Sequence, residues 1–172
     1  MGASLDGLVD ELRDAARELD AAVWASGLQG RFTSTRRTRA EQTRLYRAYV
    51  SGRHPFPVAP PGASAHEYGE AFDYLVTPSD AQEDVGYTWQ QWGGVWGGRA
   101  DVVHFELPGA SQRALKAYQE GKIPEQESTW WDYASILAPM KGVDVLDTPV
   151  SKKIVEQGIY SPTMCRWFGI LC

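Results

Sequence analysis

Two of the three histidines lie in segments that also carry carboxylates. The segment SAHEYGEAFD contains His66 and Asp73, and the segment DVVHFE contains Asp101 and His104. Zinc binds imidazole nitrogen and carboxylate oxygen, and a catalytic zinc site uses three protein ligands with one open position for water. His66, Asp73 and His104 could supply such a ligand set. Asp101 could then accept a proton from the activated water.

Spacing alone leaves a second interpretation open. A histidine in an alternating strand is more often a hydrogen-bonded structural residue than a ligand. HEYGE also differs from HExxH, so the helical zinc-protease motif is absent. If the site is catalytic, Arg37 is the candidate to stabilise the oxyanion. His54 lies in a Pro-rich loop and is expected to be a solvated residue.

Other residues could bind substrate. Gln42 could contact it from a helix, and Ser64 either hydrogen-bonds near the site or caps a turn. Trp92 and Trp96 either line the substrate cleft or pack in the core.

The acidic residues near these segments have their own expected roles. Glu41 is expected to cap a helix, and Glu67 and Glu70 are expected to be solvated. Glu106 shares a strand face with His104, so it is either a partner of that histidine or a surface residue.

Periodicity predicts the elements that must position these side chains. Residues 4–26 show a helical apolar stripe, and Thr38 with Glu41 forms a capping box that opens the next helix. Alternation and turn residues predict the rest. The predicted order is helix 4–26, strand 30–35, helix 38–50, Pro-rich loop 54–64, strand 69–76, short helix 79–84, strand 100–107 and helix 110–121. This order predicts an α+β fold, a small antiparallel sheet flanked by helices.

Four stretches, in order, resemble one enzyme family. They are TSTRRTRAEQ, PPGASAHEYGEAFD, which fits PGxSxHxxGxAxD throughout, WGGVW and DVVHF, which fits DxxHF. From Ser34 to Glu106 the chain resembles zinc peptidases that cut bacterial cell-wall peptides. These are the D-Ala-D-Ala carboxypeptidases and dipeptidases (VanY-like) and the L-alanyl-D-glutamate endopeptidases of phage lysins.

The resemblance implies a fold of the hedgehog/D-Ala-D-Ala peptidase type and a role for each site residue. It implies that His66, Asp73 and His104 bind zinc, that Asp101 is the general base, and that Arg37 clamps the substrate or oxyanion. The carboxypeptidases and dipeptidases usually have Glu where this chain has Asp101. That difference, with WGGxW before it, points to the endopeptidase branch and the L-Ala-D-Glu bond. The D-Ala-D-Ala bond is the runner-up.

Composition limits the class of protein and its partners. The 172 residues carry a net charge of -5, which disfavours general nucleic-acid binding. Residues 31–53 nevertheless hold seven Arg against one Glu, and this block could hold the carboxylates of peptidoglycan stem peptides. No apolar run approaches the roughly 18 residues of a membrane helix.

The expected organisation is a peptidase domain at 1–124 and an extension at 125–172 that docks to other virion proteins, binds the wall or covers the domain. The bonding state of Cys165 and Cys172 is left open. No secretory signal is recognised. We therefore expect a phage-encoded lysin that moves from host cytoplasm to the cell wall, or a virion-associated one. The rival interpretations are a structural virion protein that retains the fold and a zinc peptidase acting on other peptides.

Overall fold

A computed structural model, which describes residues 2–122, contains an antiparallel sheet of four strands in the spatial order β1-β2-β4-β3. The strands are β1 (Gln29–Ser34), β2 (Ala71–Thr77), β3 (Val95–Trp96) and β4 (His104–Glu106). Strand β2 pairs with β1 on one side and with β4 on the other, so it occupies the interior of the sheet.

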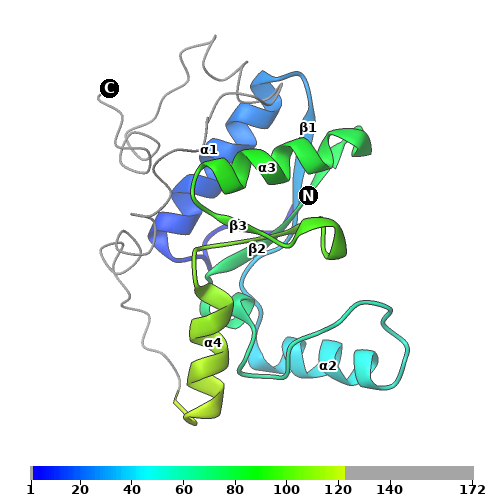
Figure 1. Cartoon of the computed structure of the whole chain (residues 1–172), viewed down its shortest axis with the longest axis vertical. Coiled ribbons are helices and arrows are strands. Elements are labelled where there is room, and N and C mark those ends of the chain that lie inside the picture. Colours follow the sequence, from blue (N-terminus) through cyan, green and yellow to red (C-terminus); the bar gives the residue numbers. More distant parts are fainter. Residues whose placement is uncertain (1, 123–172) are drawn as a thin grey trace.

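Four α-helices accompany the sheet within residues 2–122. They are α1 (Asp10–Ala25), α2 (Arg39–Val50), α3 (Gln82–Gln91) and α4 (Ala110–Gln119), and three short 3-10 helices are η1 (Ala65–Tyr68), η2 (Ser79–Ala81) and η3 (Gly98–Ala100). Figure 1 shows α2 and α4 at the same end of the molecule, with α1 and α3 at the other end beside the strands. The predicted α+β fold with a small antiparallel sheet is confirmed.

The hydrophobic core lies on one face of the sheet. Successive side chains of a strand point to opposite faces. Phe72, Tyr74 and Phe105 therefore enter the core, where they join Trp89 of α3 and the apolar stripe of α1. Phe72 and Phe105 stack with ring centroids 5.3 Å apart.

The same alternation turns the chemically active side chains to the other face. Asp73 lies between Phe72 and Tyr74 on β2, and His104 and Glu106 flank Phe105 on β4. The register sets Asp73 directly opposite His104 and pairs Asp73 with Ser34 on β1. The sheet therefore has a dry apolar face and a face that carries the predicted ligands.

Several predicted boundaries were wrong. Helix α1 begins at Asp10 rather than at residue 4, and the short helix predicted at 79–84 continues as α3 to Gln91. Strand β3 was not predicted. The predicted strand 100–107 is shortened to His104–Glu106, because the chain turns through η3, with Gly98 at φ +64°. Asp101 consequently lies in a turn beside the sheet.

The capping box at the start of α2 is confirmed. The Thr38 hydroxyl accepts a hydrogen bond from the Glu41 backbone at 3.2 Å, and the Glu41 carboxylate accepts one from the Thr38 backbone at 2.8 Å. This cap fixes the start of α2 directly after Arg37, which lies at the site.

No helix within the described residues is long and apolar enough to cross a membrane. The predicted extension at 125–172, with Cys165 and Cys172, lies outside the described residues.

Candidate metal centre and catalytic pocket

Three elements bring the predicted ligands together. His66 comes from η1, Asp73 from β2 and His104 from β4. Between the first two, Gly69 adopts φ +71°, and a Cβ there would lie 2.5 Å from the Gly7 carbonyl oxygen. Glycine is therefore required for the tight reversal that leads η1 into β2.

The ligand atoms lie at mutual distances that suit a zinc ion. His66 Nε2 lies 3.3 Å from Asp73 Oδ1 and 3.3 Å from His104 Nδ1, and His104 Nδ1 lies 3.5 Å from Asp73 Oδ1. A tetrahedral ion with ligand bonds of about 2.0–2.1 Å would set its ligand atoms about 3.4 Å apart. Within the described residues, this is the cluster of histidine and acidic groups able to hold a metal ion.

The outer nitrogen of each imidazole is already engaged. His66 Nδ1 lies 2.7 Å from the Thr35 carbonyl oxygen, and His104 Nε2 lies 3.0 Å from the Glu106 carboxylate. Because these groups accept the N–H of each ring, the inner nitrogen of a neutral ring has its lone pair directed to the metal position. The donor set and its orientation therefore fit zinc.

Positively charged and hydrogen-bonding neighbours keep the Asp73 carboxylate ionised. Its second oxygen, Oδ2, accepts a hydrogen bond of 2.7 Å from Arg37 Nη2. Burial opposes ionisation here, but hydrogen bonds from His104 and His66 and the charge of Arg37 lower the pKa of Asp73. The carboxylate is therefore charged at neutral pH, as a metal ligand must be.

His104 is shared between two carboxylates. Burial alone would lower its pKa, but hydrogen bonds with Asp73 and Glu106 raise the pKa of His104 to about 9 in the metal-free protein. Glu106 is itself held by the Ser111 hydroxyl, which donates a hydrogen bond of 2.6 Å. The chain Ser111–Glu106–His104 thus runs from the start of α4 to the ligand cluster.

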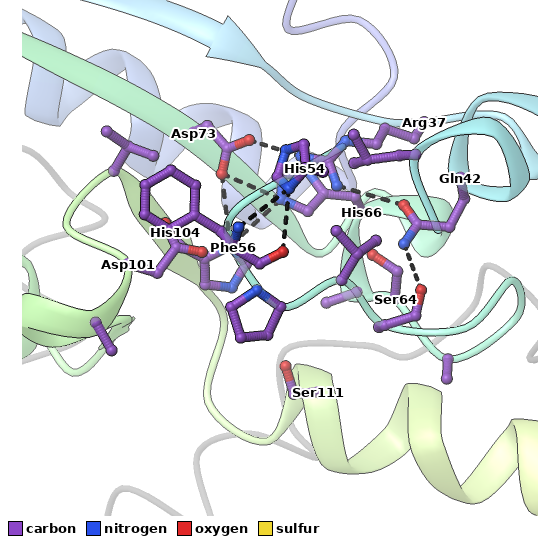
Figure 2. Close-up of a pocket in the computed structure, with 18 of the residues that line it drawn as sticks. Arg37, Gln42, His54, Phe56, Ser64, His66, Asp73, Asp101, His104 and Ser111 are labelled. Carbon is purple, nitrogen blue, oxygen red and sulfur yellow. Dashed lines mark hydrogen bonds and ion pairs between the residues drawn. The ribbon is translucent and has the colours of Figure 1, made fainter. Parts of the chain in front are cut away.

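Asp101 lies beside the cluster in the same pocket (Figure 2). The pocket has a volume of about 400 Å³. Burial raises the pKa of Asp101 above the ordinary value of an aspartate. The turn that carries Asp101 packs closely against Gly97. A Cβ on Gly97 would lie 2.5 Å from the Asp101 carbonyl oxygen, so glycine at this position lets Asp101 lie near His104.

Gln42 and Ser64 also line this pocket. Gln42 is 1% exposed, accepts a hydrogen bond from Arg37 Nη1 at 3.3 Å and donates one to the Ala59 carbonyl at 2.8 Å. Ser64 precedes η1, and its side chain makes no capping hydrogen bond. The structure therefore places Ser64 in the pocket lining and shows no capping role for its side chain. Substrate contacts by both residues stay predictions.

Trp92 and Trp96 do not line the pocket. They are 3% and 6% exposed and belong to the hydrophobic core. Trp96 donates from Nε1 to the Val102 carbonyl at 2.8 Å, and Gly86 makes room for its ring. For both residues the structure favours the core-packing alternative over the expected substrate contact.

The Pro-rich loop, a long loop of the kind that is often functional, forms one wall of the pocket. His54, Phe56, Pro57, Val58 and Ala59 line it. His54 was expected to be solvated, but it is only partly exposed, and its Nδ1 lies 3.0 Å from the Phe56 carbonyl oxygen. The signal in the sequence was the concentration of prolines, which stiffen a loop long enough to cover a site.

The expectation that Glu67 and Glu70 are solvated was wrong. They are 8% and 6% exposed. Glu67 pairs with Arg39 and accepts a 2.6 Å hydrogen bond from the Gly62 backbone, and Glu70 pairs with Arg113 at 2.9 Å. Buried carboxylates require such partners, and here the two arginine partners come from distant parts of the sequence.

The comparison with known families supplies the assignment. Residues 6–108, more than half of the chain, match the family VanY, described as D-alanyl-D-alanine carboxypeptidase. The chain belongs to this family. Together with the two-histidine, one-aspartate cluster, membership makes the chain a zinc metallopeptidase, as predicted.

Solved structures with a similar fold include other peptidases. The vancomycin-resistance D,D-pentapeptidase VanY of a VanB-type cassette, in complex with Zn(II), is 18% identical, with a TM-score of 0.49 over 71% of this chain and 84% of that one. The LD-carboxypeptidase LdcB is 23% identical, with a TM-score of 0.48 over 67% and 76%. The L,D-carboxypeptidase DacB from Streptococcus pneumonia is 22% identical, with a TM-score of 0.47 over 70% and 82%. No curated protein matches the sequence significantly.

Proposed function

We propose that this metallopeptidase hydrolyses the L-Ala-D-Glu bond of peptidoglycan stem peptides. The observation that carries the proposal is Asp101. An aspartate stands here where the carboxypeptidases of the family usually have glutamate, and it lines the pocket beside the ligand cluster. The WGGVW segment before it, which is similar to that of the endopeptidases, supports the same branch.

Different residues of the chain bind the metal and transfer the proton. His66, Asp73 and His104 would hold zinc, which supplies Lewis-acid polarisation of the peptide carbonyl and lowers the pKa of water. Asp101 accepts the proton of the attacking water as the C–O bond forms. It returns that proton to the amine nitrogen as the C–N bond breaks, which leaves a carboxylate and a free amine. The raised pKa of Asp101 suits a group that gains and loses a proton in turn.

Arg37 serves the ligand cluster as well as the predicted oxyanion. Its side chain is oriented by three partners: Asp73 at 2.7 Å, Ser34 at 3.0 Å and Gln42 at 3.3 Å. A guanidinium has five N–H donors, so donors remain for a developing negative charge. Gln42 connects this arginine to the loop wall through Ala59.

Mass spectrometry of purified peptidoglycan after digestion tests the proposal. Zinc-loaded protein should create new amino termini on D-Glu, and both chelation and Asp101→Asn should abolish them. Asp80→Asn, an exposed aspartate on η2, is the matched control and should digest normally. Normal digestion by Asp101→Asn would refute the assignment of the base.

The second candidate is cleavage of the D-Ala-D-Ala bond. It is favoured by the description of the matched family as D-alanyl-D-alanine carboxypeptidase. Release of free D-Ala without new D-Glu amino termini, in the same digestion, would replace the first candidate with this one.

The resemblance to phage lysins supports a proposal for the biological setting. We propose that the chain acts as a lysin that reaches the wall from the host cytoplasm or within the virion. A particle preparation probed with an antibody against the chain distinguishes the two routes.

A further inference from the structure

A second hollow adjoins the catalytic pocket. It has a volume of about 320 Å³ and is lined by Ala3, residues 33–37, Glu41, Arg44 and Leu45. We call it the arginine hollow, because three of its lining residues are Arg36, Arg37 and Arg44. They come from the segment that links β1 to α2 and from α2 itself.

Two of these arginines form no ion pair, although Arg44 lies close enough to Glu41 for its charge to act on that carboxylate. Arg37 is paired with Asp73. Arg36 and Arg44 are exposed, and neither forms an ion pair or donates a hydrogen bond to any residue in the described part of the chain. The acid that shares the hollow, Glu41, is held by the Thr38 cap. The guanidinium groups of Arg36 and Arg44 therefore keep N–H donors that a ligand in the hollow can use.

The arginine hollow and the catalytic pocket are neighbours that share two lining residues. Arg37 and Leu45 line both cavities. Because Arg37 also touches the Asp73 ligand at 2.7 Å, the hollow begins one side chain away from the ligand cluster. An extended chain advances about 3.3 Å per residue. The residues next to the bond that is cut are therefore the candidates to reach the hollow.

We propose that the arginine hollow is a subsite for a free carboxylate of the stem peptide, a proposal that rests on the proposed function. Guanidinium groups bind carboxylates through paired, charge-assisted hydrogen bonds. Two residues next to the L-Ala-D-Glu bond offer such a group. D-Glu is linked through its side chain and keeps its α-carboxylate free. The third residue carries a free carboxylate when it is diaminopimelate and none when it is lysine.

Three peptides, acetylated at the amino end and amidated at the carboxyl end, separate these sources. The first is L-Ala-γ-D-Glu-diaminopimelate. The second carries a carboxamide in place of the free D-Glu carboxylate, and the third has lysine in place of diaminopimelate. With zinc-loaded, full-length protein, neutralising the recognised carboxylate should lower kcat/KM about tenfold, through KM. The peptide that loses rate identifies the carboxylate.

The double variant R36Q/R44Q should cleave all three peptides equally, at the rate of the wild type on the poorer peptide. The matched control R31Q/R53Q also removes two exposed arginine charges, but neither residue lines the hollow. It should keep the wild-type preference. A wild type that does not discriminate, or an R36Q/R44Q variant that still does, overturns the proposal.

A binding experiment tests the subsite independently of the proposed function. Calorimetry measures the binding of the same peptides to Asp101→Asn and to the triple variant that also carries R36Q/R44Q. If no L-Ala-D-Glu bond is cut, but Asp101→Asn prefers one carboxylate and loses that preference in the triple variant, the subsite stands and the endopeptidase assignment fails. Equal binding of all three peptides, or no binding, overturns the subsite.

Discussion

The two ligand histidines are held by different kinds of partner. His66 uses a backbone carbonyl, that of Thr35, whereas His104 uses the Glu106 carboxylate. A backbone carbonyl cannot be removed by substitution, but the carboxylate can. Substitution of Glu106 therefore tests how the orientation and charge of the His104 ligand depend on its partner.

Replacing Glu106 with glutamine should weaken zinc binding about tenfold. This is the lower end of the usual range for such partners, because an amide oxygen can still accept the Nε2–H of His104. Competition with a chromogenic chelator measures the change. Glu120→Gln removes an exposed carboxylate at the end of α4 and should leave the affinity unaltered. Unchanged affinity in Glu106→Gln would mean that the contact with His104 does not orient the ligand.

Zinc binding at pH 7 should release about one proton from the protein. His104 has a pKa of about 9 without metal, so it is protonated at neutral pH, and a metal accepts only the neutral ring. The apparent affinity should rise as pH increases and level off above about 9. Calorimetry in two buffers of different ionisation enthalpy counts the protons. Binding without proton release at pH 7 would show that His104 is neutral before the metal arrives.

For single residues, the sequence predicted which side chains are metal ligands better than it predicted their burial and their contact partners. His66, Asp73 and His104 were found because their residue types and short-range patterns are diagnostic. Trp92 and Trp96 were given two roles, because an aromatic pattern is the same in a core and in a cleft. Ser111 was missed and the burial of Glu67 and Glu70 was mispredicted, since their partners are set by tertiary contacts.

The turn between η1 and β2 is the element on which the ligand geometry depends. Gly69 is constrained in two ways, by its positive φ and by the Gly7 carbonyl oxygen. Gly52, after α2, has φ +73° but nothing within 4 Å of a Cβ. A comparison of substitutions at Gly69 and Gly52 therefore separates the cost of backbone strain from the cost of steric conflict.

Gly52→Ala should destabilise the protein by about 1–2 kcal/mol, the cost of a left-handed conformation for a residue with a Cβ. Gly69→Ala should cost about 1–3 kcal/mol more, because the N-terminal segment or η1 must move. Urea unfolding measures both values, and zinc affinity should fall only in Gly69→Ala. Equal losses of stability would show that the N-terminal segment moves away without cost.

Elements with a clear periodic pattern were found, although α1 begins later than predicted, and elements defined by pairing were missed or given the wrong length. The capping box fixed the start of α2 to within a residue. Strand β3 has two residues, too few for alternation to be visible. The predicted strand 100–107 included Asp101, because Val102, His104 and Glu106 alternate, and only the pairing of β4 with β2 and β3 shows where the strand begins.

In the whole molecule, the core and the ligand cluster occupy opposite faces of one sheet. The core residues of α1, β2, α3 and β4 pack without any contribution from the ligands. In addition, Arg37 and the protonated His104 neutralise Asp73 when no metal is bound. The ligands therefore should not need zinc to be brought together, unlike those of small domains whose cores are too small to fold alone.

Removal of zinc should accordingly lower stability without unfolding the protein. At free zinc concentrations about one hundredfold above the dissociation constant, the metal should add about 2.7 kcal/mol. Urea unfolding with and without a chelator measures this difference. Near-ultraviolet circular dichroism, which reports the packing of buried rings such as Trp89, should be retained by the metal-free form. Asp73→Asn, which weakens the ligand set, should reduce the response to zinc. Loss of the aromatic signal on chelation would instead make the metal a part of the fold, and the two faces of the sheet would then have to form together.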